Sequence, residues 1–291
     1  MRRDRMMTGV ESSGIDATWL LANLEIASVP SGADQDAGPP VETLVLGPKA
    51  FHAAENYVLS LFQLYPNVYL HKTTRAAEKL FSALMQRVIL LSRQDHADKT
   101  GLPDKHPIRR FAVAPDRIEF SLSLDDQVFW GALPMMVEAE DAVVADWARR
   151  LRERRLPKCL DIRKKLEHMC PVEKGGEQAR NATLKLQCDF VCQEIETAKR
   201  APEFSESLIL VDQTRRAPYR KFQDSRTPLN QILIRQESGD VFDMAERSPI
   251  VASAETFELC RVYIAEGDNE AKDMVENIIG TIPKGIEDDV A

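Results

Sequence analysis

Two phenols, an imidazole and two cationic groups stand close together in one short segment of the chain. They belong to Tyr65, Tyr69, His71, Lys72 and Arg75. Tyr65, Tyr69 and Lys72 follow one another at steps of four and three residues, so in an unbroken helix they would share one face. Such a face is suited to a sugar, which packs on the rings, and to a phosphate, which binds the cations. A core-facing tyrosine pair with a solvated basic edge fits the same spacing, and from spacing alone it is the commoner arrangement.

The elements that would position this cluster are mainly helical. Apolar residues recur at three- and four-residue steps from about residue 49 to residue 93, which predicts a long helical pair. Pro66 lacks a backbone N–H and is expected to break or kink this pair beside Tyr65. Ahead of it, residues 16–23 predict a short helix capped by Asp16, and the alternating segments 24–29 and 41–46 predict two strands.

The rest of the chain predicts more helices and then a change of pattern. Helical periodicity returns in residues 124–133, 139–155, 161–169 and 173–200. The polar, turn-rich segment 95–110 predicts a surface loop. Strand patterns follow in residues 207–213, 230–235 and 257–264, and a closing helix in residues 271–280. The sequence therefore predicts a mostly α fold, with a helical body and a small β-hairpin over residues 1–200 and a smaller α+β C-terminal lobe over residues 201–291.

The composition disfavours several classes of protein. The 291 residues carry a formal net charge of −8, so no overall positive field attracts nucleic acid or an anionic membrane surface. No apolar run approaches the roughly 20 residues of a membrane-spanning helix. The basic start of the chain is followed by a polar segment in place of the apolar core of a secretion signal. A cytoplasmic protein without membrane or general nucleic-acid partners is expected.

Two clusters suggest metal chemistry but have simpler explanations. Four possible zinc ligands are His168, Cys170, Cys188 and Cys192. The short Cys-x-x-Cys spacing typical of zinc sites is missing, and Cys188 and Cys192 lie in an apolar rhythm where cysteine behaves as a small core residue. The carboxylates of Asp125 and Asp126 precede a helical pattern, where they are expected to cap the helix and interact with its dipole.

A basic cluster lies in the C-terminal lobe of this otherwise acidic chain. It consists of Arg215, Arg216, Tyr219, Arg220 and Lys221. Its cations are suited to a nucleotide phosphate, and the tyrosine ring offers a face for stacking. An ordinary solvated loop has the same composition, so both interpretations stay open.

The segment VYLHKTTRAAEK, together with the opening RRDRMMTGV, resembles the second half of the HD-domain metal-dependent phosphohydrolases. Among these it is most similar to the deoxynucleoside triphosphate triphosphohydrolases, which include the SAM-and-HD-domain nucleotide hydrolase. The resemblance is specific over residues 2–9 and 68–79, and it extends more loosely to residues 257–279. It implies that residues 1–200 are the helical remainder of an HD-type phosphohydrolase domain. It also favours the phosphate interpretation of the C-terminal basic cluster, because relatives bind regulatory nucleotides near that lobe.

The resemblance also implies a metal site whose ligands are missing from these residues. The family uses a histidine, an adjacent His-Asp pair and a distant aspartate to hold divalent metal such as Mn, Mg, Fe or Zn. None of the histidines is followed by aspartate; they are His52, His71, His96, His106 and His168. No catalytic residue and no metal ligand is therefore predicted in this chain. Either a catalytic half that precedes these residues is missing, or the protein is naturally degenerate.

Residue by residue, the resemblance implies a substrate-binding role for four side chains. Asp4 matches an aspartate beside the nucleotide sugar, where a carboxylate accepts a hydrogen bond from a 3′-hydroxyl. Tyr69 matches a tyrosine that packs on the deoxyribose, and His71 and Lys72 are expected at the rim of the pocket or in structural roles. Leu61 departs from the pattern, because the dNTP-hydrolysing relatives usually have an arginine there that binds phosphate.

Two functions of different class follow from these expectations. One is an HD-type phosphohydrolase-like protein that binds a dNTP-like ligand and is inactive as given. The other is a non-catalytic nucleotide-sensing or scaffold protein. A homo-oligomer is expected in either case, because the apolar face around Phe62, Leu64 and Val68 is predicted to be partly uncovered.

Overall fold

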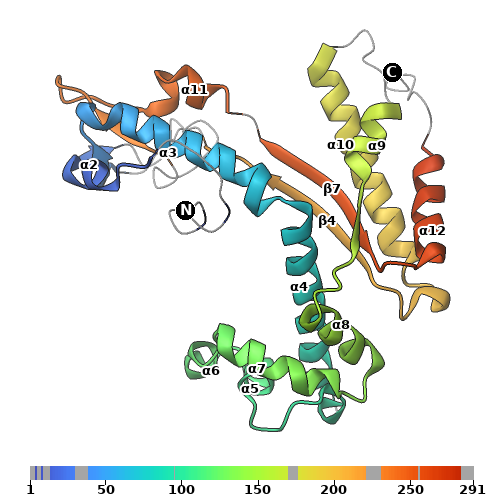
Figure 1. Cartoon of the computed structure of the whole chain (residues 1–291). Helices are drawn as coiled ribbons and strands as arrows, with labels where there is room; N and C mark the ends of the chain where they lie inside the picture. Colours follow the sequence, from blue (N-terminus) through green and yellow to red (C-terminus); the bar gives the residue numbers. More distant parts are fainter. Residues whose placement is uncertain are drawn as a thin grey trace. The chain divides into compact units, whose positions relative to one another are not determined.

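The computed structural model describes residues 4, 8, 14–29, 39–94, 96–169, 176–220, 231–254 and 256–282. The chain forms two compact units (Figure 1). Unit 1 comprises residues 1–71 and 214–258, and unit 2 comprises residues 72–213 and 259–291. Each unit is therefore built from two separate stretches of sequence. The predicted mostly α fold with small β elements is confirmed, whereas the division at residue 200 stays a prediction.

Unit 1 combines short helices with a four-stranded sheet. Its helices are α2 (Ala17–Ala22), α3 (Phe51–Leu64) and α11 (Pro249–Ala252). Its strands are β1 (Leu24–Val29), β2 (Val41–Leu46), β5 (Leu233–Arg235) and β6 (Val241–Asp243), in the spatial order β1-β2-β5-β6. The first two strands are antiparallel, with Leu24 opposite Leu46, and β2 runs parallel to β5. The predicted cap of α2 is confirmed, because the Asp16 carboxylate accepts a hydrogen bond from the backbone N–H of Trp19 at 2.9 Å.

The core of unit 1 joins the sheet to helix α3. Its buried members are Leu46, Ala50, Ala54, Val58, Ile234, Met244 and Val251. Leu64, at the end of α3, has 0% exposure, and the Phe62 ring packs against Phe257 at 5.0 Å between centroids. The expectation that the apolar face around Phe62, Leu64 and Val68 is partly uncovered was therefore wrong for Leu64, whereas Phe62 and Val68 are partly exposed.

The predicted helical pair is present, and it is interrupted where Pro66 stands. Helix α3 gives way to a π-helix, Tyr65–Tyr69, in which the N–H of Leu70 donates to the carbonyl of Tyr65 at 2.7 Å. Helix α4 (Lys72–Arg93) begins only after a non-helical His71. The argument that Tyr65, Tyr69 and Lys72 share a face of one helix was therefore wrong for Lys72, since the periodicity does not carry across the break.

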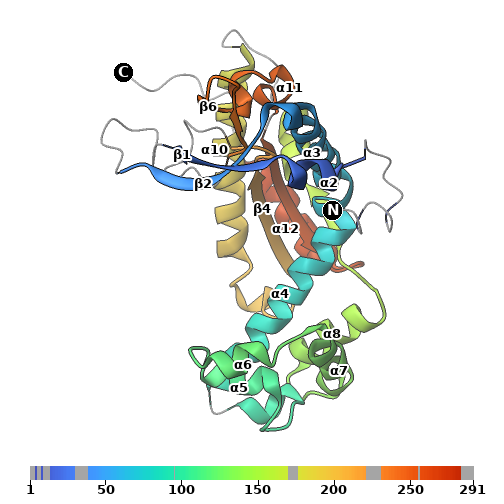
Figure 2. The same ribbon diagram turned by 90° about the vertical axis from the view of Figure 1, so that its left-hand side faces the viewer.

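Unit 2 is built around a three-stranded sheet of order β3-β7-β4. These strands are β3 (Lys158–Asp161), β4 (Ile209–Arg216) and β7 (Phe257–Ile264). The helices are α4, α5 (Pro107–Val113), α6 (Ile118–Leu122), α7 (Asp126–Val137), α8 (Ala142–Arg152), α9 (Ile162–Met169), α10 (Gly176–Ala198) and α12 (Asn269–Gly280). The far end of α4 lies among the small helices α5 to α8 (Figure 2).

Two hydrophobic cores occupy the two faces of this sheet. Because successive side chains of a strand point to opposite faces, Val262 and Ile264 enter one core and Tyr263 enters the other. The first core packs β7 against α9, α10 and α12, which lie beside the sheet in Figure 1. The second core joins Tyr263, Leu208 and Leu210 to α4, α7 and α8. A single sheet thus holds the whole of unit 2 together.

Residues 95–110 are more ordered than predicted. The described part contains a 3₁₀ helix, Ala97–Thr100, and the first turn of α5, with Leu102 and Ile108 buried. Pro107 occupies the first turn of α5, where its missing N–H costs nothing, and the His106 side chain accepts from the N–H of Ile108. The surface-loop prediction was wrong here because proline and polar residues start a helix as readily as they form a loop. In the described residues no helix is long and apolar enough to cross a membrane.

Candidate functional site

The structure brings together two of the predicted site residues in unit 1. The Tyr69 hydroxyl donates a hydrogen bond to Asp4 Oδ2 at 2.6 Å, although the two residues are 65 positions apart in the chain. Tyr69 is placed by the π-helix, which turns its side chain differently from a continuous α-helix. The backbone carbonyl of Asp4 in turn accepts a hydrogen bond from the Thr8 hydroxyl at 2.6 Å. Bond lengths in this range are typical of well-formed O–H···O hydrogen bonds.

The environment of Tyr69 keeps its phenol protonated. Desolvation and the hydrogen bond to the Asp4 carboxylate raise the pKa of Tyr69 to about 12. The Tyr65 ring contacts the Tyr69 ring edge-on, with 5.7 Å between centroids, and lies 6.0 Å from the Phe257 ring. The rings of Tyr65, Tyr69 and Phe257 form an aromatic wall with the Asp4 carboxylate at its edge.

The other two predicted binding residues lie just beyond this wall in sequence. His71 and Lys72 are both exposed. His71 lies in the non-helical turn that ends unit 1, and Lys72 is the first residue of α4 in unit 2. Leu61, where phosphate-binding relatives are expected to have arginine, is a partly buried residue of α3.

The C-terminal basic cluster is divided by the structure. Arg215, Arg216 and Arg220 are exposed, and Arg215 Nε lies 3.4 Å from Glu258 Oε1. Tyr219 packs on the core of unit 1, its hydroxyl donates to the Asp243 carboxylate and it accepts from the N–H of Ile232. Burial and the neighbouring carboxylate raise the pKa of Tyr219 above its ordinary value. Lys221 lies outside the described residues.

The remaining sequence candidates have structural roles. Asp125 caps α7, because its carboxylate accepts from the N–H of Val128 at 2.8 Å, as predicted. Cys188 and Cys192 are 3% and 5% exposed within the core of unit 2, which confirms them as core residues. Cys192 Sγ lies 3.2 Å from Cys260 Sγ. Cys170 lies outside the described residues.

The residues present do not fit the metal site that the resemblance implies. Across the described part of the chain, no three His, Cys, Asp or Glu side chains lie together as metal ligands would. The histidines also lack the adjacent aspartate in the sequence itself. No chemical step through a metal is therefore derived for these residues.

One strong polar contact was missed from the sequence. In unit 2, Arg75 donates to both carboxylate oxygens of Asp212, from Nε at 2.9 Å and from Nη2 at 2.6 Å. The Asp212 side chain has 0% exposure, and Lys79 Nζ lies 3.4 Å from its Oδ1. The spacing of Arg75 and Lys79 by four residues was visible in α4. Their carboxylate partner is 137 positions from Arg75 and has no local pattern.

Comparison with known proteins finds one family model and one curated relative that match part of the chain. Residues 40–110 match the family model described as the HD associated region. The uncharacterized protein YwfO of Bacillus subtilis is 25% identical over 158 residues, which are 54% of this chain and 32% of YwfO.

Two solved structures share the fold of this chain. A phosphohydrolase from Bacteroides thetaiotaomicron superposes with a TM-score of 0.56 at 21% identity, covering 90% of this chain and 58% of that protein. A hypothetical protein from Aquifex aeolicus superposes with a TM-score of 0.51 at 16% identity, covering 96% of this chain and 54% of that protein. The chain thus spans about a third of YwfO and little more than half of each solved protein.

Proposed function

We propose that this chain is the part of an HD phosphohydrolase-like protein that binds the sugar of a nucleotide, resembling the dNTP triphosphohydrolases. The proposal rests on the hydrogen bond between Tyr69 and Asp4, which joins the two residues that the resemblance places at the sugar. Their contact does not follow from the local sequence, since 65 positions separate the two residues. In this proposal the ligand is dNTP-like and the protein is a homo-oligomer.

In this proposal Tyr69 and Asp4 have different roles in binding the sugar. The Tyr69 ring, held edge-on by Tyr65, forms a flat surface on which a deoxyribose packs and which limits the room for a 2′-hydroxyl. A carboxylate offers two oxygens with about four acceptor sites, so Asp4 can accept from a 3′-hydroxyl as well as from Tyr69. The bond also fixes the position of the Asp4 carboxylate. Preorganisation of this kind favours binding because less freedom is lost when the ligand arrives.

Binding measurements on residues 1–291 test the proposal directly. Calorimetric titration with a deoxynucleoside triphosphate and with its 3′-deoxy analogue should show tighter binding of the 3′-hydroxyl compound. Asp4→Asn should weaken binding of the 3′-hydroxyl compound more than binding of the analogue, because the lost acceptor bonds to that hydroxyl. Tyr69→Phe should reduce the free energy of nucleotide binding by about 0.5–1.5 kcal/mol. Tyr69→Ala should reduce it further, because the ring that contacts the sugar is removed.

A matched control for Asp4→Asn is available in the same unit. Asp240→Asn makes the same change in a carboxylate that accepts from a serine hydroxyl, at 2.8 Å from Ser238 Oγ. It should leave nucleotide binding unchanged. Equal affinities of wild type and Tyr69→Ala for every nucleotide would show that the wall binds no sugar, and the proposal would then be wrong.

The alternative is a non-catalytic nucleotide-sensing or oligomeric scaffold protein. It is favoured by an exposed apolar pair on the β1–β2 hairpin, Ile26 at 67% and Leu44 at 63% exposure, which lie directly opposite each other. A second copy of the chain would cover such a pair. Light scattering at micromolar concentration tests it: Ile26→Lys should convert an oligomer into a monomer, and a wild-type monomer would refute it.

A further inference from the structure

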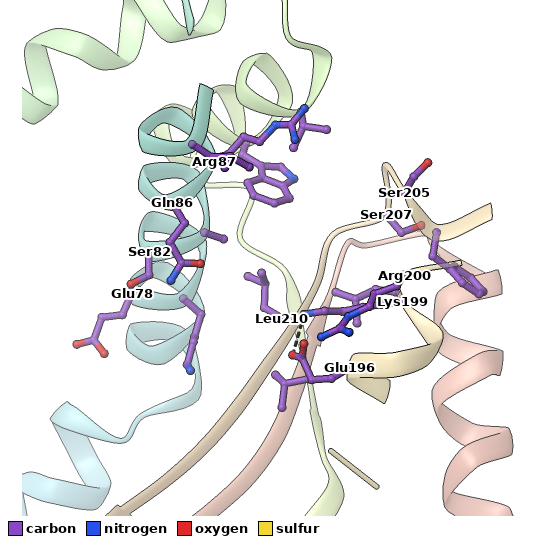
Figure 3. Close-up of a pocket in the computed structure, with 18 of the residues that line it drawn as sticks. Glu78, Ser82, Gln86, Arg87, Glu196, Lys199, Arg200, Ser205, Ser207 and Leu210 are labelled. Atoms are coloured by element: carbon purple, nitrogen blue, oxygen red, sulfur yellow. Dashed lines mark hydrogen bonds and ion pairs between the residues drawn. The ribbon is translucent and has the colours of Figure 1, made fainter. Parts of the chain in front are cut away.

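Unit 2 contains a pocket that the proposed function does not use. Its volume is about 790 Å³, within the range of about 300–1,000 Å³ that small-molecule sites occupy. It is lined by α4, α8, the end of α10 and the start of β4, all within unit 2. Side chains of α4 face those of the α10 end across it (Figure 3).

The pocket concentrates positive charge in an acidic protein. Two carboxylates, of Glu78 and Glu196, line it together with five cationic side chains. The cations are Arg75, Lys79, Arg87, Lys199 and Arg200. Behind the lining, Asp212 pairs with Arg75 and Lys79, and Asp141 pairs with Arg87. Five cations against these four carboxylates leave a local excess of one positive charge, whereas the whole chain carries −8.

Several donors in the pocket have no partner within the described structure. The guanidinium of Arg200 makes no ion pair or hydrogen bond there, and it reaches into the space beside Lys199 (Figure 3). The indole N–H of Trp147 is buried and has no acceptor among the described residues. The hydroxyls of Ser205 and Ser207 also line the pocket. The indole N–H is the buried donor of this set, and a buried donor without an acceptor is costly. Arg200 and Ser205 are exposed, so their donors are accessible to an anionic ligand.

Part of the lining is apolar and suits the body of a ligand. Phe204, Leu210 and Val211 contribute to the pocket beside the cations. Leu210 stands between α4 and the α10 end in Figure 3. Apolar surface next to a few convergent polar groups is the usual composition of a small-molecule site. A bare inorganic anion would leave this surface in contact with water.

We propose that this pocket binds a small phosphorylated molecule with a planar or apolar body, of the chemical class of a nucleoside diphosphate. The phosphates bind Arg200 and Lys199, with the serine hydroxyls and the Trp147 indole as further donors. The body packs on Leu210 and Phe204. The site shares no residue with the contact between Tyr69 and Asp4, so it does not depend on the function proposed above.

Calorimetric titration of the full chain with ADP, pyrophosphate and adenosine tests this site. All titrations use the Tyr69→Ala background, so that the other candidate nucleotide site contributes nothing. ADP should bind saturably with one site per chain, pyrophosphate more weakly, and adenosine most weakly. Arg200→Glu should raise the dissociation constant for ADP about tenfold or more, as the loss of a charge-assisted hydrogen bond implies. Trp147→Phe keeps an aromatic ring but loses the indole N–H, and it should raise the dissociation constant several-fold.

Arg149→Glu is the matched control. Arg149 is an exposed residue of α8 in the same unit that does not line the pocket, and the substitution makes the same change of charge. It should alter the dissociation constant for ADP less than about twofold. The proposal is overturned if ADP does not bind at about 1 mM, if adenosine binds as tightly as ADP, or if Arg200→Glu binds ADP as Arg149→Glu does. The sugar site of unit 1 is tested separately with deoxynucleoside triphosphates, and its failure would leave the effect of Arg200→Glu on ADP binding unchanged.

Discussion

Removing the guanidinium of Arg75 is expected to destabilise unit 2 by about 3–5 kcal/mol, because it leaves a buried carboxylate without its main partner. The Asp212 side chain has 0% exposure and receives two hydrogen bonds from Arg75. Lys79, with its Nζ at 3.4 Å from Asp212 Oδ1, compensates in part. Arg75→Met should therefore fall near the lower end of that range.

The double variant Arg75→Met/Asp212→Leu distinguishes the net contribution of the ion pair from the cost of leaving one buried charge unpaired. The fully buried carboxylate is then gone, and the remaining cation, Lys79, is 29% exposed. The stability of the double variant should therefore lie within about 1–2 kcal/mol of wild type, far from the sum of the two single effects. Arg87→Met is the matched control. Arg87 pairs with Asp141 at 2.6 Å, and the two side chains are 38% and 9% exposed, against 17% and 0% for Arg75 and Asp212. Because this pair is less buried, Arg87→Met should cost less than Arg75→Met.

Urea unfolding followed by tryptophan fluorescence measures these free energies. The chain has three tryptophans, and two of them, Trp130 and Trp147, belong to unit 2. In a Trp19→Phe background the emission therefore reports on unit 2 alone. The reasoning would be refuted if Arg75→Met cost no more than Arg87→Met, or if the double variant were as unstable as both single changes combined.

Three further outcomes are expected. Residues 1–291 should release no phosphate or triphosphate from nucleotides with Mn²⁺ or Mg²⁺, because they contain no His-Asp pair; turnover above a mock preparation would contradict this. Tyr69 holds its proton in the folded state up to a pKa of about 12, against 10.0 when unfolded. Its contribution to stability should thus be complete below pH 10 and be lost as the pH rises towards 12; Tyr69→Phe should flatten that part of the pH dependence, and an unchanged profile would contradict the contact. Leu64→Ala should cost about 2–5 kcal/mol in urea unfolding, because the side chain is fully buried, and a cost below 1 kcal/mol would show that the site is open.

Local patterns predicted the elements of this fold well where one residue type decided the structure. Asp16 and Asp125 were recognisable as helix caps, and Pro66 marked the interruption between α3 and α4. The pattern could not predict that a π-helix and a turn follow Pro66, because the break depends on where the two flanking helices pack. The placement of Lys72 relative to Tyr69 was wrong for this reason.

Contacts between distant residues were predictable only through resemblance to known proteins. The chemistry of Tyr69 and Asp4 gave no indication that they meet, and their proximity followed from a family pattern alone. The pair of Arg75 and Asp212 had no such pattern and was missed. The full burial of Leu64 was missed likewise. The contact of its neighbour Phe62 with Phe257 was also missed, because Phe257 lies almost two hundred positions downstream.

The interleaving of the two units has a consequence for the order in which the chain can fold during its synthesis. Unit 1 requires β5 and β6 from residues 233–243, and unit 2 requires β7 and α12 from residues 257–280. Proteins of several domains usually fold from the N-terminus while the ribosome is still translating. Here neither unit has all of its strands until most of the chain has been translated. The core on α3 is completed only by Ile234, Met244 and Val251, and the core on α4 only by Leu208, Leu210 and Tyr263. Nascent chains of this protein should therefore depend on chaperones that shield these incomplete cores.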